Sequence, residues 1–240
     1  MKVRAAVFDV YHTLLQPAPS TDGADRLWQE LFQDHLGSPP PFSHAEFSTR
    51  TKQVVERQHT AGQAQGIPCP EILWPSVVME VIPSLARLAP DTRADFILRQ
   101  IQISRTFQLA EGAAECLRYL IDQGGVLGIA SNAQAYTVCE LANALGTAGL
   151  DLSRFDPHLC FWSYENGFSK PDPHVFRLLT ARLEGRGINP AQILMVGDRL
   201  DNDIAPARAF GWHTWRIGSP HSGLEAGTWQ ELLAWLNEER

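Results

Sequence analysis

The chain has 240 residues, of which 44% are hydrophobic and 20% are charged, so it is too apolar for an intrinsically disordered protein and long enough for one or two domains. Twenty Lys and Arg residues against 27 Asp and Glu residues give a net charge of −7, which argues against a nucleic-acid-binding protein. A small anionic substrate is not excluded, because a pocket can be locally positive on an acidic protein.

The sequence predicts neither export nor a membrane partner. No apolar run approaches the length of a membrane span, and the apolar stretch 5–8 ends at Asp9, too early for a signal peptide. The four cysteines, at positions 69, 116, 139 and 160, are widely spaced, which favours buried free thiols in a reducing compartment. We therefore expect a cytoplasmic protein, and its oligomeric state stays open.

Short apolar runs predict the strands of a parallel sheet. The first run, residues 3–9, is continuous and rich in Val and Ala, as is typical of a strand buried on both faces. Strands alternating with helices indicate an α/β fold. Four further strands are predicted at 126–130, 159–162, 193–196 and 213–217, with helices at 111–123, 175–183 and 205–210.

Residues 14–109, between the first strand and the others, contain no convincing strand pattern. This region is predicted to be an all-helical domain inserted after the first strand, with Pro-rich breaks between its helices. Near the end of the chain, residues 228–231 match a helix capping box. The predicted helices of the insertion are 24–36, 44–59, 72–88 and 92–106, and the apolar stripe of the last helix is Trp229, Leu232, Leu233 and Leu236.

Two polar segments follow predicted strands, at the sheet edge where open parallel sheets bind ligands. Asp9 follows the first strand on a rigid element, which suits a nucleophile, although an Asp there can also be an ordinary turn residue. Ser131 and Asn132 follow the next strand. They offer a hydroxyl and backbone N–H groups to an anion, or they cap the helix that follows.

Two later segments add charge at the same edge. Lys170 precedes a proline, which fixes the direction of the backbone, so the lysine could place one cation in the crevice. The alternative is a solvated side chain, as is usual for an isolated lysine in a loop. Asp198, Asp201 and Asp203 follow another strand, and such close carboxylates repel one another. A hard cation such as Mg²⁺ would relieve the repulsion, unless the segment is an acidic surface turn. We expect these carboxylates to converge with Asp9 on one site.

In this order and strand context, the four segments resemble the motifs of the haloacid dehalogenase (HAD) superfamily of hydrolases. The resemblance covers the first strand and the chain from about residue 111 onward. It implies a Rossmann-like core, a doubly wound parallel sheet, with an inserted all-helical cap domain that helps to select the substrate. The corresponding domain bounds are 1–15 and 108–240 for the core and 16–107 for the cap.

The resemblance also implies roles for the acidic residues. Asp9 would be the nucleophile and a ligand of a Mg²⁺ cofactor. The backbone carbonyl of Tyr11 and the carboxylate of Asp198 would be further ligands. Asp203 would support the site by orienting Lys170 or a water on the metal.

Other residues would bind the substrate, a small anionic molecule, according to the same resemblance. Thr13, with Ser131 and the backbone N–H of Asn132, would hold the transferring group. Tyr11 would lie beside the substrate. Lys170 would neutralise charge on the nucleophile and on the intermediate.

Two positions depart from the phosphatase pattern of the superfamily. Phosphatase members carry a second Asp two residues after the nucleophile as the general acid and base, and this chain has Tyr11 there. The usual glycine at the next position is His12. Because loss of a general acid costs about 10²–10⁴ in rate, such a phosphatase would need a good leaving group, as in an aryl or acyl phosphate.

The Asp-x-Tyr arrangement is instead similar to the 2-haloacid dehalogenase branch, in which a halide leaves without a proton. Those dehalogenases need no metal, and they typically lack the Gly-Asp pair that this chain keeps as Gly197-Asp198. They also usually have a Tyr six residues after the lysine, where this chain has Phe176. Clustered carboxylates without a cation are unfavourable. We therefore expect Mg²⁺-dependent phosphate hydrolysis through an aspartyl intermediate on Asp9, with a 2-haloacid dehalogenase or a catalytically impaired binding protein as the alternatives.

Overall fold

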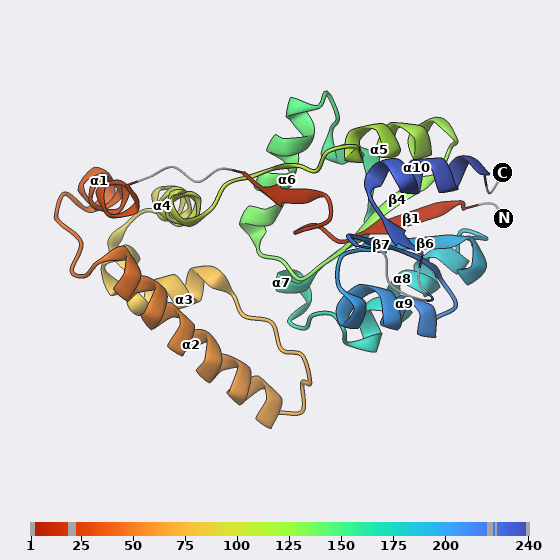
Figure 1. The fold of residues 1–240 in the computed structure, drawn as a ribbon. Helices are drawn as coiled ribbons and strands as arrows, with labels where there is room; N and C mark the ends of the chain where they lie inside the picture. Colours follow the sequence, from red (N-terminus) through yellow and green to blue (C-terminus); the bar gives the residue numbers. More distant parts are fainter. Residues whose placement is uncertain (1–2, 19–22, 220–222, 224, 239–240) are drawn as a thin grey trace. The chain divides into compact units, whose positions relative to one another are not determined.

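The computed structural model describes residues 3–18, 23–219, 223 and 225–238 of the 240 (Figure 1). The chain divides into two compact units. The first contains residues 1–16 and 107–240, and the second contains residues 17–106. Two separate segments of the chain therefore build the first unit.

The first unit is built on a six-stranded sheet with the strand order β5-β4-β1-β6-β7-β8, in which all neighbouring strands are parallel. The chain places β4 on one side of β1 and β6 on the other. Ligand sites of open parallel sheets lie at the carboxyl ends of the strands where the order reverses in this way. The strands are β1 (Ala5–Phe8), β4 (Val126–Ser131), β5 (Phe155–Trp162), β6 (Ile193–Gly197), β7 (His213–Ile217) and β8 (Ala226–Gly227).

Helices cover both faces of this sheet, with α5 and α10 on one side and α8 and α9 on the other (Figure 1). Alternate residues of a strand point to opposite faces, so Ala6 and Phe8 of β1 belong to one hydrophobic core and Ala5 and Val7 to the other. Burial on both faces explains the continuous apolar runs of the sequence. The helices are α5 (Ala113–Asp122), α6 (Ala135–Thr147), α7 (Ser163–Asn166), α8 (Pro173–Glu184), α9 (Ala205–Ala209) and α10 (Trp229–Glu238), with short 3₁₀ turns η2 (Leu152–Arg154) and η3 (Pro190–Gln192).

The architecture confirms the predicted fold class, a doubly wound parallel sheet with a helical insertion. The prediction of no strand in residues 14–109 is wrong at both edges, where β2 (Leu15–Pro17) pairs with β3 (Phe107–Leu109). A strand of three residues is too short to show an alternation of apolar and polar residues in the sequence. The predicted strand 159–162 begins earlier, at Phe155, because the exposed residues Pro157 and His158 interrupt its apolar run.

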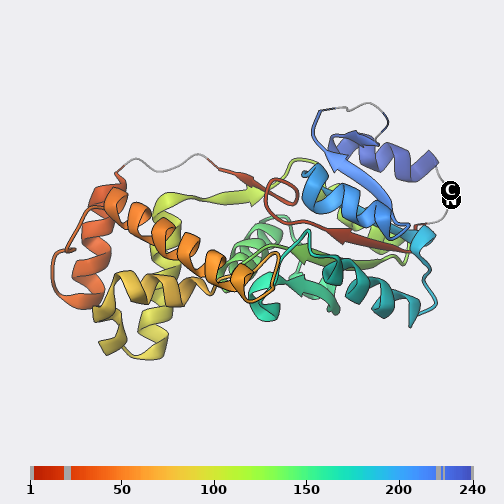
Figure 2. The same ribbon diagram turned by 90° about the horizontal axis from the view of Figure 1, so that it is seen from below.

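The described part of the second unit contains four α-helices, drawn from orange to yellow-green and seen from a second direction in Figure 2. Trp28, Phe32 and Phe96 are fully buried and form edge-to-face ring pairs at its centre. The predicted helix 72–88 is divided, because Pro83 has no N–H group and cannot continue a helix. The elements are α1 (Ala24–Leu36), α2 (His44–Ala64), α3 (Trp74–Val81), the 3₁₀ turn η1 (Pro83–Arg87) and α4 (Pro90–Ser104).

Several smaller predictions can be compared with the structure. The capping box at Thr228 is present, with the Glu231 N–H donating to its Oγ1 at 3.2 Å, but Leu233 of the apolar stripe is only partly buried. None of the four cysteines forms a disulfide. Cys116 is buried as expected, but Cys139 is exposed, so the prediction of buried thiols does not hold for every cysteine. No helix in the described part of the chain has the length and apolar character needed to cross a bilayer.

Candidate active site

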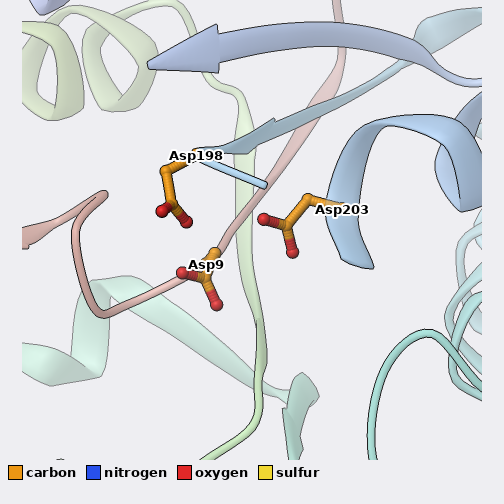
Figure 3. Close-up of side chains that lie close together, drawn as sticks. All are labelled: Asp9, Asp198 and Asp203. Atoms are coloured by element: carbon orange, nitrogen blue, oxygen red, sulfur yellow. The ribbon is translucent and has the colours of Figure 1, made fainter. Parts of the chain in front are cut away.

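Three aspartates meet at the carboxyl ends of two neighbouring strands. Asp9 follows β1, Asp198 follows β6, and Asp203 lies in η4 (Leu200–Ile204), a π-helical turn that leads into α9. Their carboxylates point toward one another, with one oxygen of each within 4.8 Å of the others (Figure 3). Turns of this type are frequent at functional sites. The fold therefore brings together two segments from opposite ends of the sequence.

The fourth acidic residue of the expected group, Asp201, does not join the cluster. Its exposed side chain pairs with Arg199, whose Nη2 lies 2.7 Å from Asp201 Oδ2. Residues two apart in a helical turn do not share a face, so Asp203 turns inward while Asp201 turns to solvent. The expectation that Asp201 converges on the site is wrong.

Lys170 is buried between two of the three carboxylates. Its Nζ donates to Asp9 Oδ1 at 2.7 Å and to Asp203 Oδ1 at 2.5 Å, and the residue is only 3% exposed. Burial by itself lowers the pKa of Lys170, but the two carboxylates outweigh it and raise that pKa above its usual value. The lysine is therefore a permanent charge, neutralised on two sides as a buried ion requires.

The carboxylates carry more negative charge than Lys170 neutralises. Burial, with a smaller contribution from Asp203 and Asp198, raises the pKa of Asp9 to about 6 against the opposing effect of Lys170. Burial and Asp203 likewise raise the pKa of Asp198. A divalent cation relieves such an excess, and oxygen ligands from carboxylates suit Mg²⁺. The residues present thus fit this ion.

Gly197 and Arg199 hold Asp203 in place. The backbone N–H of Arg199 donates to Asp203 Oδ2 at 3.0 Å. A Cβ atom on Gly197 would lie 2.5 Å from the Asp203 side chain, so only glycine permits this approach. The Gly197-Asp198 pair therefore has a physical reason: the glycine makes room for one carboxylate and the next residue supplies another.

Asn132 fixes the loop that carries Lys170. Its Nδ2 donates to the Lys170 carbonyl at 2.8 Å, and its Oδ1 accepts from the Lys170 N–H at 2.7 Å. Sequence reasoning considered anion binding by its backbone N–H or a role as a helix cap, and it missed this contact because nothing local indicates a partner 38 residues away. The alternative role of Ser131 or Asn132 as a helix cap is wrong, since α6 begins at Ala135 with Gln134 as its N-cap.

Two predicted site hydroxyls, Thr13 Oγ1 and Ser131 Oγ, are buried without a hydrogen-bond partner among the described residues. Thr13 lies in the turn after β1, and Ser131 is the last residue of β4. An unsatisfied buried hydroxyl costs about 1–3 kcal/mol. Such a group calls for an explanation, and a ligand that completes the bond is one. Neither side chain lines the pocket at the three aspartates.

A pocket of about 170 Å³ opens onto the three aspartates. Its wall contains Lys170 and Asn132, and it also contains Asn202 and Arg199, for which the sequence predicted no role. Apart from Thr13 and Ser131, the predicted site residues are brought together here. The lining residues are Asp9, Tyr11, His12, Asn132, Lys170, Asp198, Arg199, Asn202 and Asp203.

The hydroxyl of Tyr11 is engaged with α6. It donates to the Glu140 carboxylate and shares a hydrogen bond of 2.8 Å with Thr137 Oγ1, while the ring packs on Phe107 with 4.8 Å between centroids. Sequence reasoning missed Thr137 and Glu140, because polar residues on a helix are usually solvated. At the position of a general acid, this chain therefore has a phenol already bonded to a carboxylate.

The sequence matches, over residues 3–211, the model of a family described as haloacid dehalogenase-like hydrolase. No curated protein sequence matches the chain. A 2-haloacid dehalogenase from Pseudomonas syringae pv. Tomato DC3000 is 17% identical and has a TM-score of 0.63, with 99% of this chain and 100% of that chain covered.

Two further solved structures share the fold. The Bacillus subtilis protein YfnB, bound to magnesium, is 20% identical with a TM-score of 0.56, covering 99% of this chain and 100% of that chain. A HAD phosphatase from Thermococcus onnurineus is 19% identical with a TM-score of 0.56, covering 98% of each chain. At these identities the likeness shows a common fold and does not distinguish the chemistry.

Proposed function

Because the chain belongs to the haloacid dehalogenase-like hydrolases, we propose that it is a Mg²⁺-dependent phosphatase that acts through Asp9 on a small metabolite with a good leaving group. The observation that carries this proposal is the carboxylate of Asp198 facing that of Asp9. Lys170 already bridges Asp9 and Asp203, so Asp198 is the carboxylate left for a cation to balance. A phosphate dianion needs that additional positive charge, whereas a carbon–halogen bond does not.

Asp9 attacks phosphorus in the first step. Its Oδ1 accepts from Lys170, which leaves Oδ2 for the new bond. As the Oδ2–P bond forms, the bond from phosphorus to the leaving oxygen breaks, and the leaving group departs with the electron pair. Lys170 holds the carboxylate in position and balances the charge on the phosphoryl group as it transfers.

Water completes the reaction. It attacks phosphorus, the Asp9 carboxylate departs, and both protons of the water stay on the product, which leaves as dihydrogen phosphate. Mg²⁺, when held by Asp9, Asp198 and the Tyr11 carbonyl, would neutralise charge on the phosphate oxygens. Thr13, Ser131 and the N–H of Asn132 are the donors that we propose for those oxygens, and the two unpaired hydroxyls support this assignment.

The hydrogen bond between Tyr11 and Glu140 restricts the substrate. A phenol that donates to Glu140 cannot at the same time protonate a leaving oxygen, and its ordinary pKa near 10 is poorly matched to neutral pH. The leaving group must therefore be stable as an anion. Aryl and acyl phosphates meet this condition, and alkyl phosphates do not.

A phosphate-release assay on the purified chain tests the proposal. With Mg²⁺, we expect release from p-nitrophenyl phosphate and acetyl phosphate, at least about 100-fold slower release from glycerol phosphate, and none in EDTA. Absence of phosphate from every aryl and acyl phosphate would refute it.

A 2-haloacid dehalogenase remains the second candidate, because the engaged Tyr11 hydroxyl suits a halide that leaves without a proton. That chemistry would release chloride from 2-chloropropionate in EDTA. Ion chromatography over a panel of 2-chloroalkanoates decides between the two candidates, since the phosphatase proposal expects no chloride.

Asp198→Asn is expected to weaken Mg²⁺ binding by about 10–100-fold, since the cation loses a charged ligand. Asp201→Asn is the matched control: it removes a carboxylate from the same segment, but one that is exposed and paired with Arg199. Calorimetric titration with Mg²⁺ measures both variants. Equal affinities for the two variants would contradict the assignment of Asp198 as a ligand.

Tyr11→Asp places a carboxyl group at the general-acid position of the phosphatase pattern. We expect at least a tenfold gain on alkyl phosphates, whose leaving group needs a proton, and little gain on aryl phosphates. Tyr11→Phe keeps the backbone carbonyl and is expected to lose less than about tenfold on aryl phosphates. No gain for Tyr11→Asp would indicate a pocket shaped for other chemistry, and a 100-fold loss for Tyr11→Phe would make the phenol the acid.

A further inference from the structure

His12, beside the pocket, has an unusual backbone conformation. Its φ of 60° is the one positive value at a non-glycine residue in the described ranges 3–18, 23–219, 223 and 225–238. Hydrogen bonds hold the turn: the His12 N–H donates to Leu15 O at 2.7 Å, and Gln16 Nε2 donates to His12 O at 2.8 Å. The left-handed region favours glycine, so a histidine here costs stability, and residues kept at such a cost cluster at functional sites.

The imidazole of His12 is available to a ligand. It is an exposed side chain that lines the pocket, and it makes no hydrogen bond to any residue in the described part of the chain. It also lies near enough to Asp198 to interact with its charge. A ring N–H is thus offered at the wall of the same pocket that the three aspartates line.

Three other donors on the pocket wall are engaged. The Tyr11 hydroxyl donates to Glu140, the Asn132 amide donates to the Lys170 carbonyl, and the Arg199 guanidinium pairs with Asp201. Lys170 is bonded to two carboxylates. With a divalent cation present, the three carboxylates are balanced by that cation and Lys170. The remaining lining side chains that can donate are His12 and Asn202. Asn202 is buried and His12 is exposed, so His12 is the donor available to a substrate acceptor that extends away from the carboxylates.

We propose that His12 determines specificity: its imidazole N–H binds an oxygen acceptor on the leaving-group side of the substrate. The substrate class is then a small phosphorylated molecule with a carboxylate or carbonyl oxygen next to its phosphoryl group, which is the acyl-phosphate type among good leaving groups. This inference rests on the proposed function in placing the phosphoryl group at Asp9 and Asp198. The neutral ring is sufficient, so no change of protonation is involved.

Binding of two unreactive probes in the presence of Mg²⁺ tests the inference. Phosphonoacetate carries the added carboxylate and methylphosphonate does not. The unmodified protein is expected to bind phosphonoacetate about tenfold more tightly, which is the effect of one hydrogen bond. In His12→Gly this ratio falls to about one, within twofold, because the donor is gone.

The variants keep the test free of folding artefacts. His12→Gly is expected to keep its Tm, because relief of backbone strain offsets the added freedom of glycine in the unfolded chain. Asn tolerates positive φ and offers an amide N–H, so His12→Asn is expected to retain part of the preference. A preference that persists in His12→Gly, or an equal loss of affinity for both probes, would overturn the inference.

Failure of the proposed function gives a different result. In that case the unmodified protein releases no phosphate although it binds both phosphonates. The ratio of the two phosphonate affinities, with and without His12, is still measured from that binding. If neither phosphonate binds the unmodified protein, the inference is overturned.

Discussion

Asp9→Asn is expected to lower kcat/KM for aryl and acyl phosphates by at least ~10⁴-fold, or about 5.5 kcal/mol of barrier. The amide oxygen is a poor nucleophile, and it cannot return as a carboxylate leaving group when water attacks. The size of the side chain is unchanged. Because Lys170 keeps its bond to Asp203, the fold is expected to survive the substitution.

Asp172→Asn is the matched control for this result. Asp172 is also buried, but it lies outside the pocket and caps α8 by accepting from the His174 N–H at 2.9 Å. Asparagine is an equally good N-cap, so activity should stay within about twofold. Rapid quenching of the unmodified protein with an acyl phosphate should leave a phosphoryl group on the peptide that contains Asp9. Residual activity of Asp9→Asn above 1% would rule out a nucleophilic Asp9.

Lys170→Met is expected to lower the free energy of unfolding by about 3–5 kcal/mol and to abolish phosphate release. Met preserves most of the side-chain volume but removes the positive charge between Asp9 and Asp203. In the unmodified protein, Lys170 Nζ lies 2.7 Å from Asp9 Oδ1 and 2.5 Å from Asp203 Oδ1. Two buried carboxylates would then face each other without a counter-charge. Urea denaturation in EDTA measures the loss without interference from a bound cation.

The double variant Lys170→Met/Asp203→Asn separates electrostatics from packing. If repulsion between Asp9 and Asp203 causes the loss, neutralising Asp203 restores part of the stability, and the two changes are strongly non-additive. Activity should not return, because Lys170 also balances the transferring group. A loss below 1 kcal/mol for Lys170→Met, or strict additivity in the double variant, would contradict this account of the buried charge.

The site was predictable where its residues directly follow apolar runs. Asp9 and Asp198 each come immediately after a buried strand, and parallel strands place their carboxyl ends at one edge. Asp201 shows the limit of that reasoning. It follows β6 more closely in the sequence than Asp203 does, yet the π-helical turn directs only Asp203 inward, and no apolar pattern indicates such a turn.

The helical insertion shows the same limit in the fold. Helix periodicity located its four main segments, because an amphipathic helix repeats its apolar positions over several turns. The sequence pattern did not predict the short strands β2 and β3, because each has only three residues and its partner lies at the other end of the insertion. The division of the predicted helix 72–88 at Pro83 has a local cause that is visible in the sequence, because a proline cannot continue a helix.

The sequence by itself determined the α/β class, the family and the positions of the acidic residues, because strand and helix patterns and motif spacing are properties of neighbouring residues. Only the tertiary structure decided which groups touch. It brought Lys170 between Asp9 and Asp203, and it occupied the Tyr11 hydroxyl with Glu140. Those contacts join residues more than 30 positions apart, and they depend on strand order and turn geometry that no local pattern encodes.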